Sequence, residues 1–107
     1  MIEKGGNSVL TALQKKRAAS IIYYYGRNNQ LDILQEECAE LIQAVSKIRR
    51  GTPGADEHFI DEMSDVCIML AEFLADFDDD EKTEFYKKVN EKLTRQLDRI
   101  VKEKGAK

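Results

Sequence analysis

Two pairs of carboxylate residues, each pair three positions apart, stand in neighbouring stretches of this 107-residue chain. Glu37 and Glu40 form the first pair, and Glu62 and Asp65 form the second. Residues three apart on an α-helix lie on one flank, so each pair directs its two carboxylates to the same side. Two facing helices can therefore bring four oxygen-bearing side chains into one pocket.

Four carboxylates packed together need a positive charge between them. Without one they repel and raise one another's pKa values, and burying them adds a further cost. A hard divalent cation removes both penalties, because carboxylate oxygens are its preferred ligands. A set made only of carboxylates favours Mg²⁺, with Mn²⁺ as a substitute, over zinc or iron. Acidic pairs with this spacing also occur on ordinary solvated helices, so the spacing alone leaves both interpretations open.

The elements that must position these acids are expected to be helices. The chain has 35% charged residues, six glycines and one proline, a composition that favours long helices over a turn-rich β fold. Breaks are predicted at Gly26, over residues 51–54 and at Asp78, where three aspartates suit a helix start. Short connections between long helices predict an all-α, antiparallel four-helix bundle forming a single domain over residues 1–107. The predicted helices span 8–25, 29–50, 56–77 and 80–103.

Apolar residues recur along the second and third predicted helices in steps of three and four, which predicts the faces that pack. The stripe on the second helix is Leu31, Leu34, Cys38, Leu41, Val45 and Ile48. The stripe on the third is Phe59, Met63, Val66, Leu70, Phe73 and Phe77. So short a chain buries such faces poorly by itself, so the first and third helices are predicted to meet a second copy in a homodimer or a dimer of dimers.

The charge and the apolar runs exclude several classes of partner. A net charge of −3 predicts no general attraction to a nucleic acid polymer. No run approaches the ~18 apolar residues of a membrane span. The first six residues lack an apolar stretch of the signal-peptide type. The protein is therefore expected to be cytoplasmic, with no membrane partner.

The acidic residues lie in two recognisable motifs. The run Glu36-Glu37-Cys38-Ala39-Glu40-Leu41 resembles the EExxE motif of the MazG-like all-α NTP pyrophosphohydrolases, and Glu62-Met63-Ser64-Asp65-Val66 resembles their ExxD motif. The similarity covers residues 29–77 most specifically and is typical of the short, single-domain bacterial and phage type. It implies cleavage of nucleoside triphosphates between the α- and β-phosphates, giving a monophosphate and pyrophosphate, with a role in cleaning the nucleotide pool.

The resemblance also implies roles for individual residues. Glu37, Glu40, Glu62 and Asp65 match the Mg²⁺ ligands of the family, and Glu37 or Glu40 would accept a proton from the attacking water. Glu36 matches the leading acid of the first motif, which implies that it orients a ligand or a basic side chain without binding the metal itself.

Basic and amide residues at two places are candidates for binding the triphosphate. Lys47 and Arg50 end the second predicted helix, where cations also favour the negative end of the helix dipole. Asn90, Lys92 and Arg95 resemble the family's late Asn/Lys/Arg segment. A solvated helix face explains them equally well, so both interpretations stay open.

Other functions remain as alternatives. Phosphoribosyl-ATP pyrophosphohydrolases share the acidic motifs but usually place a lysine shortly before the paired glutamates, where this chain has Gln30 and Gln35. A di-iron bundle needs Glu-x-x-His on two helices, and the only histidine is His58, which is expected to cap or pack at the start of the third helix. A non-catalytic helical dimerisation or adaptor module is the alternative from another class.

Overall fold

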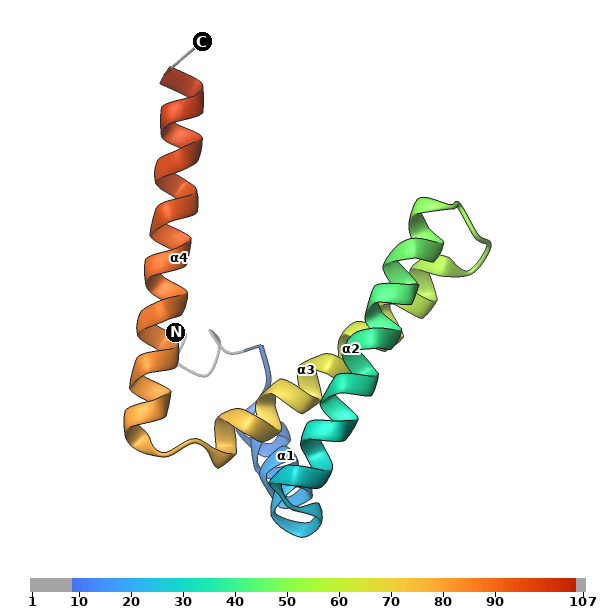
Figure 1. Cartoon of the computed structure of the whole chain (residues 1–107), viewed down its shortest axis with the longest axis vertical. Helices are drawn as coiled ribbons and strands as arrows, with labels where there is room; N and C mark the ends of the chain where they lie inside the picture. The colour runs from blue at the N-terminus through green and yellow to red at the C-terminus, as the bar shows by residue number, and fades with distance from the viewer. Residues whose placement is uncertain (1–8, 106–107) are drawn as a thin grey trace. The chain divides into compact units, whose positions relative to one another are not determined.

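The computed structural model describes residues 9–105, which contain four helices and no strand (Figure 1). The helices are α1 (Ala12–Tyr25), α2 (Arg27–Arg49), α3 (Ala55–Asp76) and α4 (Asp79–Gly105). This confirms the predicted all-α fold and its four helices. None of these helices combines the length and the apolar content needed to cross a bilayer. The chain divides into two compact units, one through Asp76 and one from Phe77, and the single-domain assignment stays a prediction.

Helix α1 starts at a capping box. Gln14 donates its backbone N–H to Thr11 Oγ1 at 3.1 Å, and Thr11 donates its own N–H to Gln14 Oε1 at 2.8 Å. These bonds satisfy backbone donors that have no partner within the helix. The helix therefore begins later than predicted; residue 8, the predicted start, lies outside the described residues.

Gly26 alone separates α1 from α2. Its φ of 89° falls in the left-handed region, which a residue without a Cβ adopts at little cost. The glycine is both the C-cap of α1 and the N-cap of α2. Asn28 and Asn29 consequently lie inside the first turn of α2, and the predicted start of that helix at residue 29 is slightly late.

Helix α4 belongs to the second unit and also starts at a capping box. Glu81 donates its N–H to Asp78 Oδ1 at 2.8 Å, and Asp78 donates its N–H to Glu81 Oε1 at 2.9 Å. The predicted helix start at the aspartate run is thereby confirmed. Phe85 makes edge contacts with Phe77 and Tyr86, yet no residue of α4 is buried.

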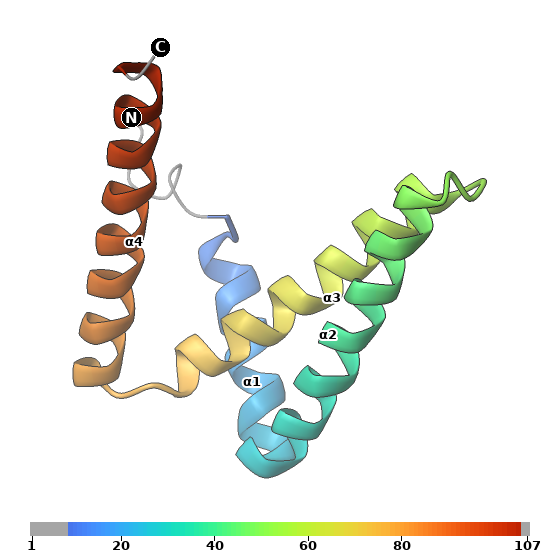
Figure 2. The ribbon, with the colours of Figure 1, turned by 45° about the horizontal axis from the view of Figure 1, so that its top comes forward.

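In the first unit, α2 and α3 form an antiparallel hairpin and run side by side in both views of the ribbon (Figures 1 and 2). Helix α1 packs mainly against α3. The apolar core is small: Ile22 of α1 meets Met69 and Phe73 of α3, and the half-buried Ile33 and Leu34 of α2 pack against them. The core thus holds one end of the hairpin together.

The side of α2 that faces α3 differs from the predicted apolar stripe. The buried residues of α2 are Gln30 and Ala44, and the half-buried Glu37 lies midway between them, seven residues from each. Leu31 and Val45 of the predicted stripe are exposed instead. The prediction was wrong for these residues because the line of closest packing runs along the edge of the stripe, through polar positions.

On helix α3, too, the line of buried residues is displaced from the predicted apolar stripe. Its buried residues include Ala55, Glu62 and Met69, again seven residues apart, whereas Met63 and Leu70 are about half exposed. Helix periodicity places residues seven apart on nearly the same line, because seven residues make about two turns. The seam between α2 and α3 therefore contains a glutamate from each helix.

Farther along this seam, towards the end of the hairpin near Gly26, a buried polar pair joins the helices. Glu72 is 2% exposed, and Gln30 Nε2 donates to its Oε1 at 2.7 Å. Asn29 Nδ2 in turn donates to Gln30 Oε1 at 2.7 Å. Burial raises the pKa of Glu72, while the hydrogen bond from Gln30 acts in the opposite direction. The pair links residues 42 positions apart and sets the alignment of the two helices.

Candidate metal centre

Carboxylates from both helices of the hairpin meet at the seam. Glu37 and Glu40 of α2 and Glu62 of α3 each offer an oxygen, and these oxygens lie within 4.8 Å of one another. Asp61, Glu62 and Asp65 form a second group with the same spacing. The two groups share Glu62, so the structure joins all four predicted metal ligands through one buried residue. Neither group contains a histidine or a cysteine.

Two oxygens of this cluster are buried without a hydrogen-bond partner: Glu37 Oε1 and Glu62 Oε1. Glu62 as a whole is only 8% exposed, and Glu37 is half-buried. A buried polar atom that lacks a partner costs about 1–3 kcal/mol. One such oxygen comes from each of the two helices, so one buried carboxylate oxygen on each side of the seam has no hydrogen-bond donor.

The electrostatics of the cluster act most strongly on Glu37. The pKa of Glu37 is raised from 4.5 to about 7, first by burial and then by the negative charges of Asp65, Glu40 and Glu62. A side-chain hydrogen bond with Glu40 acts in the same direction. The contribution of Asp65 shows that the fourth predicted ligand lies within electrostatic reach of Glu37 on α2. The other three acids therefore disfavour the charged form of Glu37 in the folded protein.

A hard divalent cation fits this set of residues. The available donors are carboxylate oxygens, which Mg²⁺ and Mn²⁺ prefer, and two of them have no other partner. A cation would supply the missing interactions and neutralise the repulsion at Glu37. Glu40 is exposed, so the cluster is open to solvent on one side, where water and a phosphate group can approach.

Two residues of this site were not assigned to it from the sequence. Asp61 joins Glu62 and Asp65 in the second acidic group. His58, expected only to cap or pack, has its Nε2 3.1 Å from Glu62 Oε2. The available signals were the position of Asp61 directly before Glu62 and the i, i+4 spacing of His58 and Glu62, which places two side chains side by side on a helix.

The other predicted site residues lie outside both acidic groups. Glu36 is exposed. Lys47 is half-buried on α2, about two turns beyond Glu40 on the same flank. Arg50 is exposed and donates from Nη1 to Ser46 Oγ at 2.6 Å. The predicted residues of α4, all exposed, are Asn90, Lys92 and Arg95. Their phosphate-binding role stays a prediction.

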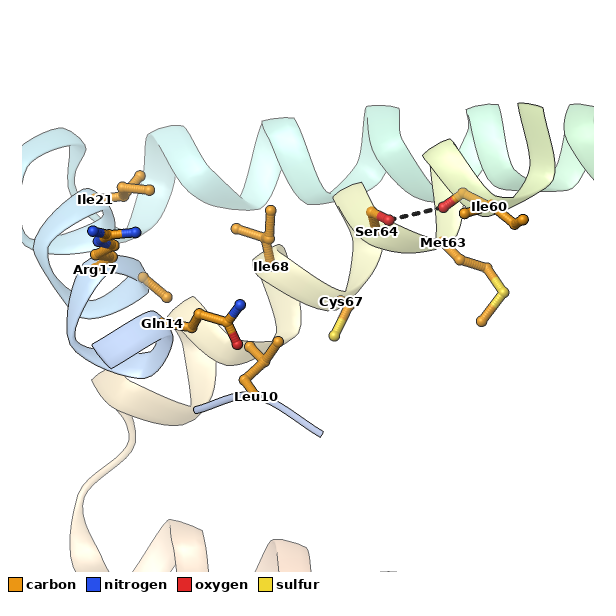
Figure 3. Close-up of a pocket in the computed structure, with 10 residues that line it drawn as sticks. Leu10, Gln14, Arg17, Ile21, Ile60, Met63, Ser64, Cys67 and Ile68 are labelled. Atoms are coloured by element: carbon orange, nitrogen blue, oxygen red, sulfur yellow. Dashed lines mark hydrogen bonds between the residues drawn. The ribbon is translucent and has the colours of Figure 1, made fainter. Parts of the chain in front are cut away.

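A separate feature of the first unit is an apolar groove of about 700 Å³ between α1 and α3 (Figure 3). Ile60, Met63, Cys67 and Ile68 line its α3 side, which is the side of that helix away from Glu62. The residues lining it from the N-terminal part of the chain are Leu10, Gln14, Arg17, Ala18 and Ile21. Arg17 is the one charged residue among those that line the groove.

No known protein family, curated protein or solved structure matches the chain. The similarity to the MazG-like family therefore stays an inference from the two acidic motifs. The functional conclusion depends on what the residues of the cluster can do.

Proposed function

We propose that the protein is a Mg²⁺-dependent nucleotide pyrophosphohydrolase that cleaves (d)NTPs between the α- and β-phosphates. One observation carries this proposal: Glu37, Glu40 and Glu62 converge from two helices, with buried oxygens of Glu37 and Glu62 that have no hydrogen-bond partner. The EExxE and ExxD motifs of the chain contain these same residues, which supports the choice of substrate. Cleaning of the nucleotide pool is the biological role that this activity suggests.

The proposed roles of the four acids come from the two motifs, and the meeting of these acids at the seam supports them. Glu37, Glu40, Glu62 and Asp65 would hold the metal, and Glu37 or Glu40 would accept the proton of the attacking water. Bound Mg²⁺ supplies charge neutralisation of the phosphates and a stabilised leaving pyrophosphate. Lys47, on the same flank of α2 as Glu40, would add positive charge for the triphosphate.

The direct test is to incubate the purified protein and Mg²⁺ with a panel of canonical and modified NTPs and dNTPs. We expect a nucleoside monophosphate and pyrophosphate in equal amounts, separated and quantified by phosphorus NMR. Water labelled with heavy oxygen will show by mass spectrometry which phosphorus atom is attacked. The activity should disappear with a chelator and return with Mg²⁺ or Mn²⁺.

Three results would contradict the proposal. Release of orthophosphate from every substrate would mean that a different bond is cut. Full activity in a chelator would contradict the proposed metal-binding role of the acidic cluster. Hydrolysis of phosphoribosyl-ATP in preference to every simple nucleotide would point to the related pyrophosphohydrolase instead.

We also propose that the protein is a homo-oligomer in which the groove between α1 and α3 packs against the same face of a second copy. The groove is apolar, and its rim contains Ile60 and Met63, which are 64% and 50% exposed. Exposed apolar surface of this kind is typical of protein interfaces. A second copy is the partner we choose for two reasons. The apolar core of the unit is small, and the groove, with Arg17 as its one charged lining residue, can pack against an identical, mostly apolar face.

We expect Ile60→Glu to weaken self-association by at least about 100-fold, since burying an unpaired carboxylate at an apolar interface costs more than about 3 kcal/mol. Analytical ultracentrifugation across the micromolar range measures this. Ile42→Glu is the matched control, because Ile42 is also exposed but lies on α2, outside the groove. A monomeric wild-type protein, or equal effects of the two substitutions, would refute the proposed interface.

A further inference from the structure

His58 makes one side-chain contact that the proposed chemistry has not used. Its Nε2 lies 3.1 Å from Glu62 Oε2, one helical turn further along α3. The Glu62 side chain is 10% exposed, whereas that of His58 is 34% exposed. An imidazole at the edge of the seam thus contacts the most buried carboxylate of the cluster.

The two carboxylate oxygens of Glu62 have different surroundings. We assign the donor role to His58: a carboxylate in its ionised form only accepts hydrogen bonds, so a bond from Nε2 to Oε2 then requires a proton on Nε2. The other oxygen, Oε1, is buried and has no hydrogen-bond partner. One oxygen is therefore held by the protein, and the other is left for a ligand.

We propose that His58 is a positioning residue for the metal centre: its Nε2–H holds Glu62 Oε2 and so presents Oε1 to the cation. This inference rests on the proposed function, because it assumes that the acidic cluster binds Mg²⁺. Glu62 belongs to both acidic groups, so fixing its carboxylate orients the one ligand that the two groups share. Hydrogen bonds from outside the coordination sphere act in this way on metal ligands and affect affinity by about 10–100-fold.

Two simpler roles for His58 fit the structure less well. His58 belongs to neither acidic group, so it is not placed as a metal ligand itself. It is also not part of the apolar core, which is formed by Ile22, Met69 and Phe73 with two partners from α2. What His58 does contact is Glu62, so an effect on that carboxylate is the role that its position supports.

The test compares two variants of similar size that differ in hydrogen bonding. His58→Leu removes the donor, whereas His58→Gln keeps an N–H that can reach the same carboxylate. We expect His58→Leu to weaken binding of Mg²⁺, measured by calorimetry on the full chain without nucleotide, by about tenfold or more. His58→Gln should restore most of the affinity. Glu57→Gln, an exposed neighbour on α3, should bind as the wild type does.

A second readout uses the fact that His58 is the only histidine in the chain, so its imidazole NMR signals are unambiguous. We expect nitrogen NMR to show the proton on Nε2 and to show this signal shifting as Mg²⁺ is added, with the same Kd as in calorimetry. A residue with a purely structural role would not follow the metal titration.

The outcomes separate this inference from the proposed function. If the wild type binds Mg²⁺ and His58→Leu binds it equally well, the positioning role is wrong while the metal centre stands. If the wild type does not bind Mg²⁺, or Glu62→Gln binds it as tightly, the centre itself is wrong. Loss of affinity in both His58 variants would also overturn the donor role.

Discussion

From the proposed function, we expect replacement of Glu40 by Gln, Glu62 by Gln or Asp65 by Asn to lower kcat for nucleotide pyrophosphohydrolysis by at least about 10³-fold. Each substitution would remove a charged ligand of the proposed cation. The effect should be largest for Glu62→Gln, since Glu62 belongs to both acidic groups. Steady-state release of pyrophosphate at saturating Mg²⁺ measures the loss. Glu40→Gln is the cleanest of the three, because an exposed residue can be changed without disturbing the seam.

Glu57→Gln is the control for these substitutions. It is the same chemical change at an exposed position of α3 outside both acidic groups, and its activity should remain close to that of the wild type. Circular dichroism should show unchanged helix content in every variant. Retention of activity in Glu40→Gln and Glu62→Gln would contradict the catalytic role of the cluster.

The second large effect concerns pH. The pKa of Glu37 rises from 4.5 to about 7 on folding, so between these pH values the folded protein binds more protons than the unfolded chain does. The free energy of unfolding contributed by this group is therefore highest below about pH 4.5, falls as pH rises to about 7 and is constant above that. The raised pKa of Glu72 acts in the same direction. Without divalent metal, the protein should thus lose stability as pH increases.

Glu37→Gln removes the titrating group and should make the metal-free protein more stable at about pH 8. A full pKa unit corresponds to about 1.4 kcal/mol, so the rise from 4.5 to about 7 corresponds to about 3 kcal/mol. Solvent around the half-buried side chain reduces this to about 1–2 kcal/mol. This should raise the Tm by roughly 5–10 °C at about pH 8 and change it little below about pH 4.5. Thermal denaturation in a chelator at several pH values measures both.

Added Mg²⁺ provides the complementary measurement. At about pH 8 it should raise the Tm of the wild type, because a ligand that binds only the folded state stabilises it. The rise should be smaller at low pH, where Glu37 is protonated, and smaller still in Glu37→Gln. A lower Tm for metal-free Glu37→Gln than for the wild type would contradict the proposed repulsion at the seam.

These two effects have one physical origin. Burial and the neighbouring negative charges make the ionised form of Glu37 unfavourable in the folded chain. The same arrangement favours a divalent cation, which relieves the repulsion when it binds. Residues that lower the stability of the protein alone are therefore the ones we expect to contribute most to metal affinity.

Much of the candidate site could be predicted from local sequence. The i, i+3 spacing places Glu37 with Glu40 and Glu62 with Asp65, because helix periodicity alone decides which residues share a flank. The start of α4 directly after Asp78 was predictable for a similar reason, since a capping box involves residues close together in the chain. The all-α fold follows from the scarcity of Gly and Pro between the breaks.

The same information could not predict which side of each helix is buried. On α2, the apolar stripe through Leu31 and Val45 is at least as apolar as the line through Gln30 and Glu37, yet the second line faces α3. That choice depends on the summed contacts of three helices, including Gln30 with Glu72, which are far apart in the chain. The spacing of residues within one helix does not predict a contact between Gln30 and Glu72, which lie on different helices.

What the sequence determined by itself is therefore local: the helices, their caps and the pairs of acids on one flank. Only the tertiary structure decided that the two pairs meet, that Glu62 is buried with a free oxygen, and that His58 contacts it. The physical reason is that periodicity sets the order of residues around a helix axis, whereas rotation about that axis is set by packing between helices.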